Sequence, residues 1–369
     1  MASFPTSIKT FPTLVDLVDS VLASHQNERG DEITAEQTFL FSGASGYVLT
    51  GAGAGTAPAW SAPAGGMSSP QGRLSLGTAT PVMVTDQADK TSIYYTPYKG
   101  NTVPMYSGSW AMTTFTELTL ALDSDSGHTG YHQSGKVFDL FVYSDSGTLR
   151  LVSGPAWTNG TTRATAIEYV GGILMNAASM TARFGSASGD TVTVAQDRGT
   201  YVGTFYASAN GTTTWEIGGD AANGDPIKLY LWNAYNRVSV DFSCHDTTDS
   251  WNYSTSTWRS KNNSNDNRAS FVRGLQEDGV SAINAMMYGK TVAGAARWGI
   301  ALDATNTFTV NTQSNNTTTT PGAAYFSQNP GLGFHYLQAV EWDNAAGTTT
   351  WYGDNAGTNR HGLTFHGYF

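Results

Sequence analysis

The residues whose types could do chemistry form three small groups, and the first is a pair of histidines. His128 and His132 are four residues apart, a spacing at which two imidazoles on one helix can hold a metal ion. They lie in Ser-Gly-His-Thr-Gly-Tyr-His-Gln, however, and glycine-containing sequences of this kind favour loops. We therefore expect two exposed loop histidines and no metal site.

The second group is Cys244-His245-Asp246, which contains residue types found in nucleophile triads. Because successive residues of a strand point to opposite faces, these three side chains cannot converge on one substrate. Cys244 is also the single cysteine, so it cannot form a disulfide within the chain. We expect it to be a small buried hydrophobic residue.

The third group places Glu341 and Asp343 beside Trp342 and Trp351. Enzymes that cleave polysaccharides need two carboxylates roughly 5 to 10 Å apart. The other acidic residues mostly occupy turn sequences, where carboxylates cap the backbone. We interpret 336–342 and 348–352 as a structural β-hairpin, and we expect no catalytic residue and no cofactor in the chain.

Aromatic residues offer a different function, because exposed tryptophan and tyrosine can stack on sugar rings or anchor protein interfaces. The chain has 10 Trp and 18 Tyr. The candidates for glycan or interface contact are Trp251, Tyr253, Trp258, Trp342 and Trp351. Packing in the core or a subunit interface and contact with a glycan both stay open.

The elements that must position these groups are short strands separated by strong turn sequences. Segments 81–84, 137–143, 191–194 and 296–302 are rich in β-formers, and Asp145-Ser-Gly147 and Asn223-Gly224 are turn signals. Two short helices are predicted at 116–122 and 163–169. The pattern predicts a mainly β chain with an antiparallel β-sandwich or jelly-roll-like body. A polar stretch at 254–270 suggests a division into domains 73–260 and 261–369.

The first 72 residues differ from this body. Proline at positions 5 and 12 keeps the start extended, and apolar residues at helical spacing follow. The apolar positions are Phe4, Phe11, Leu14, Leu17, Val18, Val21, Leu22 and Ile33. Segment 41–72 contains 8 Gly and 7 Ala and no charged residue, so it reads as a spacer after a separate segment 1–40.

Charge restricts the partners. The net charge is −10 and no Lys/Arg cluster occurs, which excludes a nucleic-acid or polybasic membrane-binding surface. No apolar run is long enough for a membrane-spanning helix, and the N-terminus lacks the pattern of a signal peptide. We therefore expect assembly in a reducing cytoplasm and release from the cell by lysis.

Three strings resemble parts of tailed-phage virion proteins. The first runs from Phe4-Pro-Thr-Ser-Ile-Lys-Thr-Phe11 through Val21-Leu-Ala-Ser-His-Gln-Asn27 to Asp31-Glu-Ile-Thr-Ala-Glu36, with departures at Gln26, Arg29 and Gly30. The second is Gly46-Tyr-Val-Leu-Thr with Ala57-Pro-Ala-Trp60. The third joins Tyr94-Tyr-Thr-Pro-Tyr98 to Leu231-Trp-Asn-Ala-Tyr-Asn-Arg237. Together they resemble the tail-fibre or head-fibre class of structural proteins.

The resemblance implies a non-enzymatic virion component whose apolar N-terminal positions attach it to other virion proteins. A tail fibre or spike that contacts the host surface, with a host glycan as a candidate partner, is the first hypothesis. A head fibre or capsid decoration protein is the second, and a polysaccharide depolymerase the third. We also expect a homotrimer, because short helices and exposed strand edges both need covering.

Overall fold

The computed structural model describes residues 33, 48–50, 59–61, 67–354, 356, 357 and 359–369. Two compact units divide the chain, Met1–Met67 and Ser68–Phe369. In the first unit, β1 (Val48–Thr50) pairs antiparallel with β2 (Ala59–Ser61). Ile33 is helical and 54% exposed, and the other seven predicted attachment residues lie outside the described residues. Within the described ranges, no helix has the length and apolar character to cross a bilayer.

The second unit is built almost entirely of strands, as predicted. Its first large sheet, sheet I, has the order β11-β12-β15-β9-β10-β13-β14, with β19 paired to β15. The bounds are β9 Val137–Asp145, β10 Thr148–Ala156, β11 Ile167–Val170, β12 Ile173–Asn176, β13 Met180–Arg183, β14 Thr191–Val194, β15 Gly199–Tyr206 and β19 Leu231–Asn233. Two small sheets accompany it, β3 (Gly72–Ser75) with β5 (Ser92–Pro97) and β8 (Leu118–Ala121), and β6 (Thr102–Tyr106) with β7 (Trp110–Thr114).

The turn between β9 and β10 shows how local sequence sets this sheet. Asp145 pairs with Thr148, so the hairpin loop is only Ser146-Gly147. Both residues have positive φ, 51° and 92°. Two-residue loops of this kind match the twist of the flanking strands. The predicted turn is confirmed, and it sets the β9–β10 register that places Phe141 opposite Val152, with both side chains buried.

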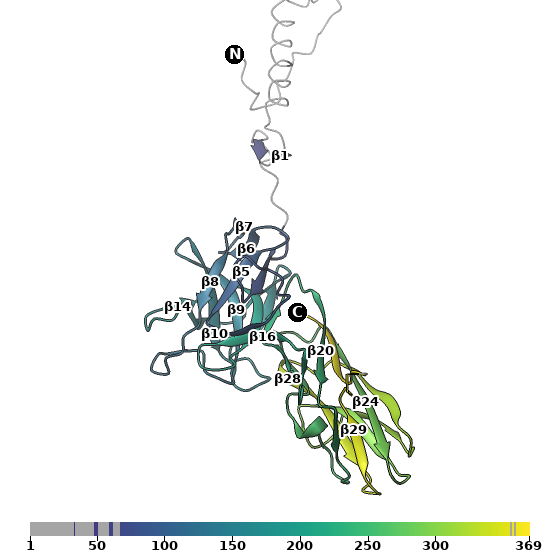
Figure 1. Ribbon diagram of the computed structural model, residues 1–369. Coiled ribbons are helices and arrows are strands. Elements are labelled where there is room, and N and C mark those ends of the chain that lie inside the picture. The colour runs from purple at the N-terminus through teal and green to yellow at the C-terminus, as the bar shows by residue number, and fades with distance from the viewer. Residues whose placement is uncertain (1–32, 34–47, 51–58, 62–66, 355, 358) are drawn as a thin grey trace, which may run out of the picture. The chain divides into compact units, whose positions relative to one another are not determined.

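Two further sheets face each other as a sandwich, which confirms the predicted fold class. Sheet II has the order β26-β25-β28-β23-β18-β16-β4, with β22 paired to β28, and sheet III has the order β17-β20-β30-β24-β29-β21, with β27 paired to β24. Phe271 of sheet II meets Phe365 of sheet III at 5.2 Å between ring centroids, and Trp298 meets Tyr288 at 5.8 Å. In Figure 1, β24 and β29 of sheet III lie in the green and yellow part of the chain.

The strands of the sandwich are short except for β24 and β28. Those of sheet II are β4 Gln87–Lys90, β16 Thr213–Ile217, β18 Ile227–Leu229, β22 Arg259–Ser260, β23 Arg268–Arg273, β25 Ala296–Leu302, β26 Val310–Ser314 and β28 Gly333–Asp343. Those of sheet III are β17 Asp220–Ala221, β20 Ser239–Asp246, β21 Ser250–Asn252, β24 Val280–Lys290, β27 Thr320–Gln328, β29 Thr349–Tyr352 and β30 Gly362–Tyr368. One 3-10 turn, η1 (Lys261–Asn263), follows β22.

Several local predictions are wrong. The two predicted helices are strands β8 and β11, because each pairs with a neighbour along its length, β5 and β12. Segment 81–84 is bent rather than a strand. The predicted 336–352 hairpin does not form either, because β28 pairs in sheet II while β29 pairs in sheet III. The turn between them carries the chain from one layer of the sandwich to the other.

The polar stretch 254–270 is packed into the sandwich. Lys261 and Asn267 are fully buried within it. Sheet II combines β4, β16 and β18 with β23, β25 and β28, so strands from both sides of residue 260 share one sheet. Within residues 68–369, this sheet shows no division at residue 260.

Candidate functional site

Glu341, Trp342 and Asp343, the main part of the predicted carboxylate–aromatic cluster, lie on β28. The alternation of side chains along this strand divides them between the interior of the sandwich and its outward face. Glu341 and Asp343 face the interior of the sandwich, and both are 0% exposed. Trp342, between them, faces outward and is partly exposed. This division follows from the period-two geometry of a strand. The two carboxylates therefore share a face with each other, but not with the neighbouring tryptophan.

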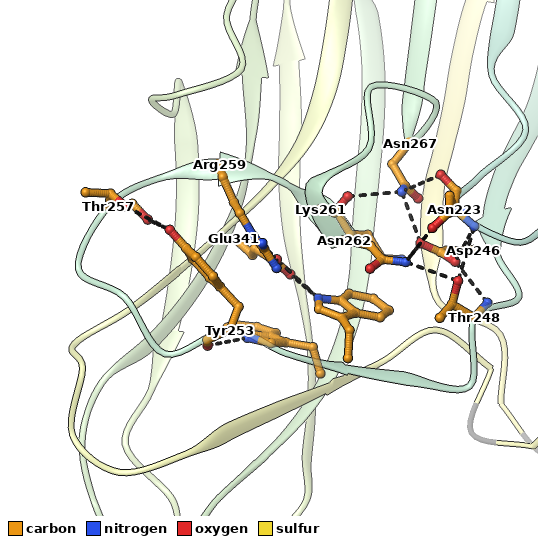
Figure 2. A network of polar contacts seen from close by, with 12 residues as sticks. Asn223, Asp246, Thr248, Tyr253, Thr257, Arg259, Lys261, Asn262, Asn267 and Glu341 are labelled. Carbon is orange, nitrogen blue, oxygen red and sulfur yellow. Dashed lines mark hydrogen bonds and ion pairs between the residues drawn. The ribbon is translucent and has the colours of Figure 1, made fainter.

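Glu341 is held by one indole and one guanidinium. Trp251 of β21 donates its Nε1–H to Oε2 at 2.9 Å and to Oε1 at 3.2 Å, and Arg259 donates Nε–H to Oε1 at 2.7 Å. Burial raises the pKa of Glu341 to about 7, although the charge of Arg259 opposes the shift. Figure 2 shows Arg259 reaching Glu341 and stacked over Tyr253, at 3.7 Å from the ring centroid.

Asp343 is paired inside the same layer. Lys290 of β24 forms an ion pair with Oδ2, and both side chains are completely buried. Thr349 donates its hydroxyl to Oδ2 at 2.7 Å, and the Ala345 N–H donates to Oδ1 at 2.8 Å. Both carboxylate oxygens of Asp343 thus accept from protein donors. In this arrangement Glu341 and Asp343 join the two sheets, and neither carboxylate reaches solvent.

The predicted tryptophans and tyrosine fall into two sets, one bonded together around the buried Trp351 and a surface set on the outward face of sheet II. All of them except Trp351 are partly exposed. Trp351 is fully buried, lies directly opposite Trp251 in the β21–β29 register, and donates Nε1–H to the Tyr253 carbonyl at 3.0 Å. The Tyr253 hydroxyl donates to the Thr257 carbonyl at 2.7 Å. The end of the sandwich that contains β21 and β29 is therefore held together by Trp251, Tyr253 and Trp351.

The surface set comprises Trp258 and Trp342, and the structure adds a third ring. The Trp258 and Trp342 centroids are 6.4 Å apart, and Phe308 lies 4.8 Å from Trp258. Phe308 is 40% exposed. The guanidinium of Arg297 lies over Trp342 at 4.4 Å. Sequence reasoning missed Phe308 and Arg297, although the alternation of β25 could have placed Arg297 on the outward face.

The Cys244-His245-Asp246 group behaves as its strand position predicts. Cys244 is fully buried, while His245 bonds to Asp220 at the surface at 2.8 Å. Asp246 lies in a separate network in which Asn262 and Asn267 donate amide N–H groups to Oδ2 at 3.0 and 3.1 Å (Figure 2). Burial acts to raise the pKa of Asp246, but hydrogen bonds, led by those from Thr248, hold it below the usual value.

The two loop histidines differ from the expected exposed pair. His128 is partly exposed between Asp123 and Asp125. His132 is fully buried, accepts the Asp123 N–H at Nδ1 at 2.8 Å, and bonds Ser153 through Nε2 at 2.8 Å. Burial lowers the pKa of His132 to about 4, so this imidazole is neutral at physiological pH. In the described part of the chain, no group of three or more His, Cys, Asp or Glu side chains is arranged to hold a metal ion.

The comparisons with known proteins do not name a family. No family model matches the chain, and no curated protein matches it. Among solved structures, it is similar to an insecticidal delta-endotoxin of Bacillus thuringiensis, with 7% identity, a TM-score of 0.20 and coverage of 76% of this chain and 49% of the toxin chain, about half its length. It is also similar to the structure of infectious bursal disease virus strain Gx, with 12% identity, a TM-score of 0.22 and coverage of 77% and 68%. An exo-β-1,3-galactanase of Phanerochaete chrysosporium, solved with galactose, matches at 10% identity and a TM-score of 0.15, covering 71% and 78%. At these TM-scores the likeness carries no argument about function.

Proposed function

We propose that the chain is a structural protein of a tailed-phage virion, a tail-fibre or spike-type appendage whose β-body contacts the host surface. The observation that carries the proposal is the division of the candidate site. Its carboxylates are bonded in buried pairs that join two sheets, while its outward face carries the exposed Phe308 and the partly exposed Trp258 and Trp342. A surface of this kind suits adhesion rather than bond cleavage.

The resemblance of the N-terminal strings supports the same proposal. Residues 68–369 form one compact unit, and the attachment segment belongs to the other unit. Under this proposal the N-terminal residues bind other virion proteins, and the particle is assembled in the host cytoplasm and released by lysis.

Self-association as a homotrimer is part of the proposal. Among the described strands, β26 pairs only with β25 and β27 pairs only with β24, so each leaves an open edge. Tyr325 of β27 is 69% exposed, and its cross-strand neighbour Ile283 is 40% exposed. Open edges and exposed apolar pairs are features that assembly covers. Light scattering of the purified full chain should give three times the chain mass of 39.2 kDa, and a monomer mass would refute the trimer.

The location is tested by immunogold electron microscopy of phage particles released from cells that produce this chain, using an antibody to residues 73–369. Gold at the tail is the expected result. Gold over the capsid would make the chain a head fibre or decoration protein, and particles without gold would refute a virion role.

A further inference from the structure

Four side chains form a continuous row across the outward face of sheet II. Strand pairing places Gln313 of β26 opposite Arg297 of β25, and Arg297 opposite Trp342 of β28. Trp258 completes the row, because it precedes β22, whose Arg259 lies opposite Glu341. Three successive pairings therefore bring together residues that are up to 84 positions apart in sequence. Three members of the row are set by the sheet itself, and Trp258 lies in the segment directly before β22.

The row is held in one conformation. Gln313 accepts the Nε–H of Arg297 at 2.9 Å, and this bond fixes the guanidinium over the Trp342 ring at 4.4 Å. Trp258 and Trp342 are inclined by only 35°, and Phe308 extends the aromatic surface beyond Trp258. Within the part of the chain that the structure describes, the terminal amino groups of Arg297 have no hydrogen-bond partner. The platform thus combines three adjacent rings, inclined to one another by 35° and 46°, with free donors at one end.

This combination matches the chemistry of a pyranose sugar. A pyranose ring presents an apolar face of C–H groups, which packs against aromatic rings, and a rim of hydroxyls, which need nearby donors and acceptors. The platform has a single cation, Arg297, and the chain carries a net charge of −10. A polyanionic saccharide would be repelled by that charge, so the surface favours a neutral glycan.

We propose that Trp342, Trp258 and Phe308 form a binding platform for a neutral pyranose glycan of the host surface, with Arg297 and Gln313 hydrogen-bonding its hydroxyls. The proposal rests on the proposed host-contact function and names the ligand class of that contact. The rings supply most of the affinity, and the arginine and glutamine select the orientation of the sugar.

The size of the platform favours a small ligand over a second copy of the chain. A stable protein interface buries about 800 Å² on each partner. A fully exposed aromatic side chain offers about 150–250 Å², and of these three rings Trp258 and Trp342 are only partly exposed and Phe308 is 40% exposed. The three rings together therefore fall well short of such an interface, but they can cover one or two sugar rings.

The full chain is titrated calorimetrically with maltohexaose, cellohexaose, mannohexaose and chitohexaose, with polygalacturonate as the anionic comparison. We expect saturable binding of at least one neutral oligosaccharide and at least tenfold weaker binding by Trp342→Ala and Phe308→Ala. Phe308 is an exposed loop residue, so its variant keeps the test valid if Trp342→Ala unfolds. Tyr169→Ala, which removes a more exposed ring from sheet I, should bind within twofold of the native chain.

Several results would overturn the platform. These are no binding of any neutral oligosaccharide, equal binding by the Phe308→Ala variant, or preferential binding of polygalacturonate. Self-association that Phe308→Ala abolishes would assign the face to a second copy instead. Gold on virions together with any of these results would leave the virion role standing while the glycan site fails.

Discussion

Trp251 of sheet III donates its indole N–H to both carboxylate oxygens of Glu341 in sheet II, at 2.9 and 3.2 Å. This hydrogen bond crosses the interior of the sandwich, from β21 to β28. Arg259 completes the coordination from β22, with Nη2 at 2.7 Å from Oε1. A carboxylate held in this way connects two layers, and its protonation should be visible in the stability of the fold.

Replacement of Glu341 by glutamine should change how stability depends on pH. The folded-state pKa of Glu341 is raised to about 7, whereas an unfolded glutamate has a pKa of about 4.3. Between these values the folded state holds the proton more tightly, so native stability falls as pH rises towards 7. The contribution lost is about 3 kcal/mol.

Urea unfolding at several pH values between 4.5 and 7.5 measures this effect. The Glu341→Gln variant should lose less unfolding free energy over that range than the native chain. Parallel pH profiles for the two proteins would show that Glu341 keeps an ordinary pKa in the fold.

His132 should act in the opposite direction. Its folded-state pKa is lowered to about 4, and the unfolded value is about 6.5. The unfolded state binds the extra proton across this window, so the stability that neutral His132 contributes is full above about pH 6.5 and falls as the medium is acidified. In the His132→Gln variant, the fall in unfolding free energy on acidification should be smaller by about 3 kcal/mol. The same urea series measures it. An unchanged acid limb would contradict the buried neutral imidazole.

The buried Lys290–Asp343 pair should be costly to break from one side. Lys290→Met leaves Asp343 buried without its cation, and we expect a loss of about 3–5 kcal/mol. Lys228→Met is the matched control, because Lys228 pairs with Glu216 at a partly exposed position where such a pair contributes about 0–1 kcal/mol. Unfolding in urea compares the two. Equal losses would mean that burial of the first pair adds nothing.

Arg73 ties the first strand of the body to its last residue. Its Nη1 donates to the carbonyls of Asn236 and Phe369 at 2.8 and 2.7 Å, and Nε donates to Pro81. Arg73→Met removes three hydrogen bonds from a charged donor, and of the three carbonyls only that of Phe369 keeps a backbone partner among the described residues, the Val238 N–H. The loss should cost about 3 kcal/mol or more. Arg360→Met, at a side chain that is 68% exposed, is the control and should change stability by less than about 0.5 kcal/mol. A loss confined to Arg360→Met would refute this role.

The strands were predictable where local pattern and turn chemistry agree. The β9–β10 hairpin follows from alternating β-formers and from Ser146-Gly147, which both adopt positive φ. The β28–β29 hairpin was mispredicted because the sequence between these strands has the residues of a hairpin turn. Local sequence does not specify which sheet a strand joins. Lys261 was missed as a buried residue because its partner, the carbonyl of His361, is 100 residues away. Phe308 was not predicted as a surface-site residue because its neighbour Trp258 is also distant in sequence.

The Arg73 contact with Phe369 spans 296 positions of sequence. On the ribosome, the first strand of the body emerges long before the Phe369 carbonyl to which Arg73 donates its hydrogen bond. Parts of the sheets can form earlier, but the body cannot close until residue 369 has left the exit tunnel. Contacts of such long range slow folding and leave strand edges open to neighbouring chains in the meantime. Closure of the body should therefore follow the synthesis of residue 369 and should benefit from chaperones that shield those edges.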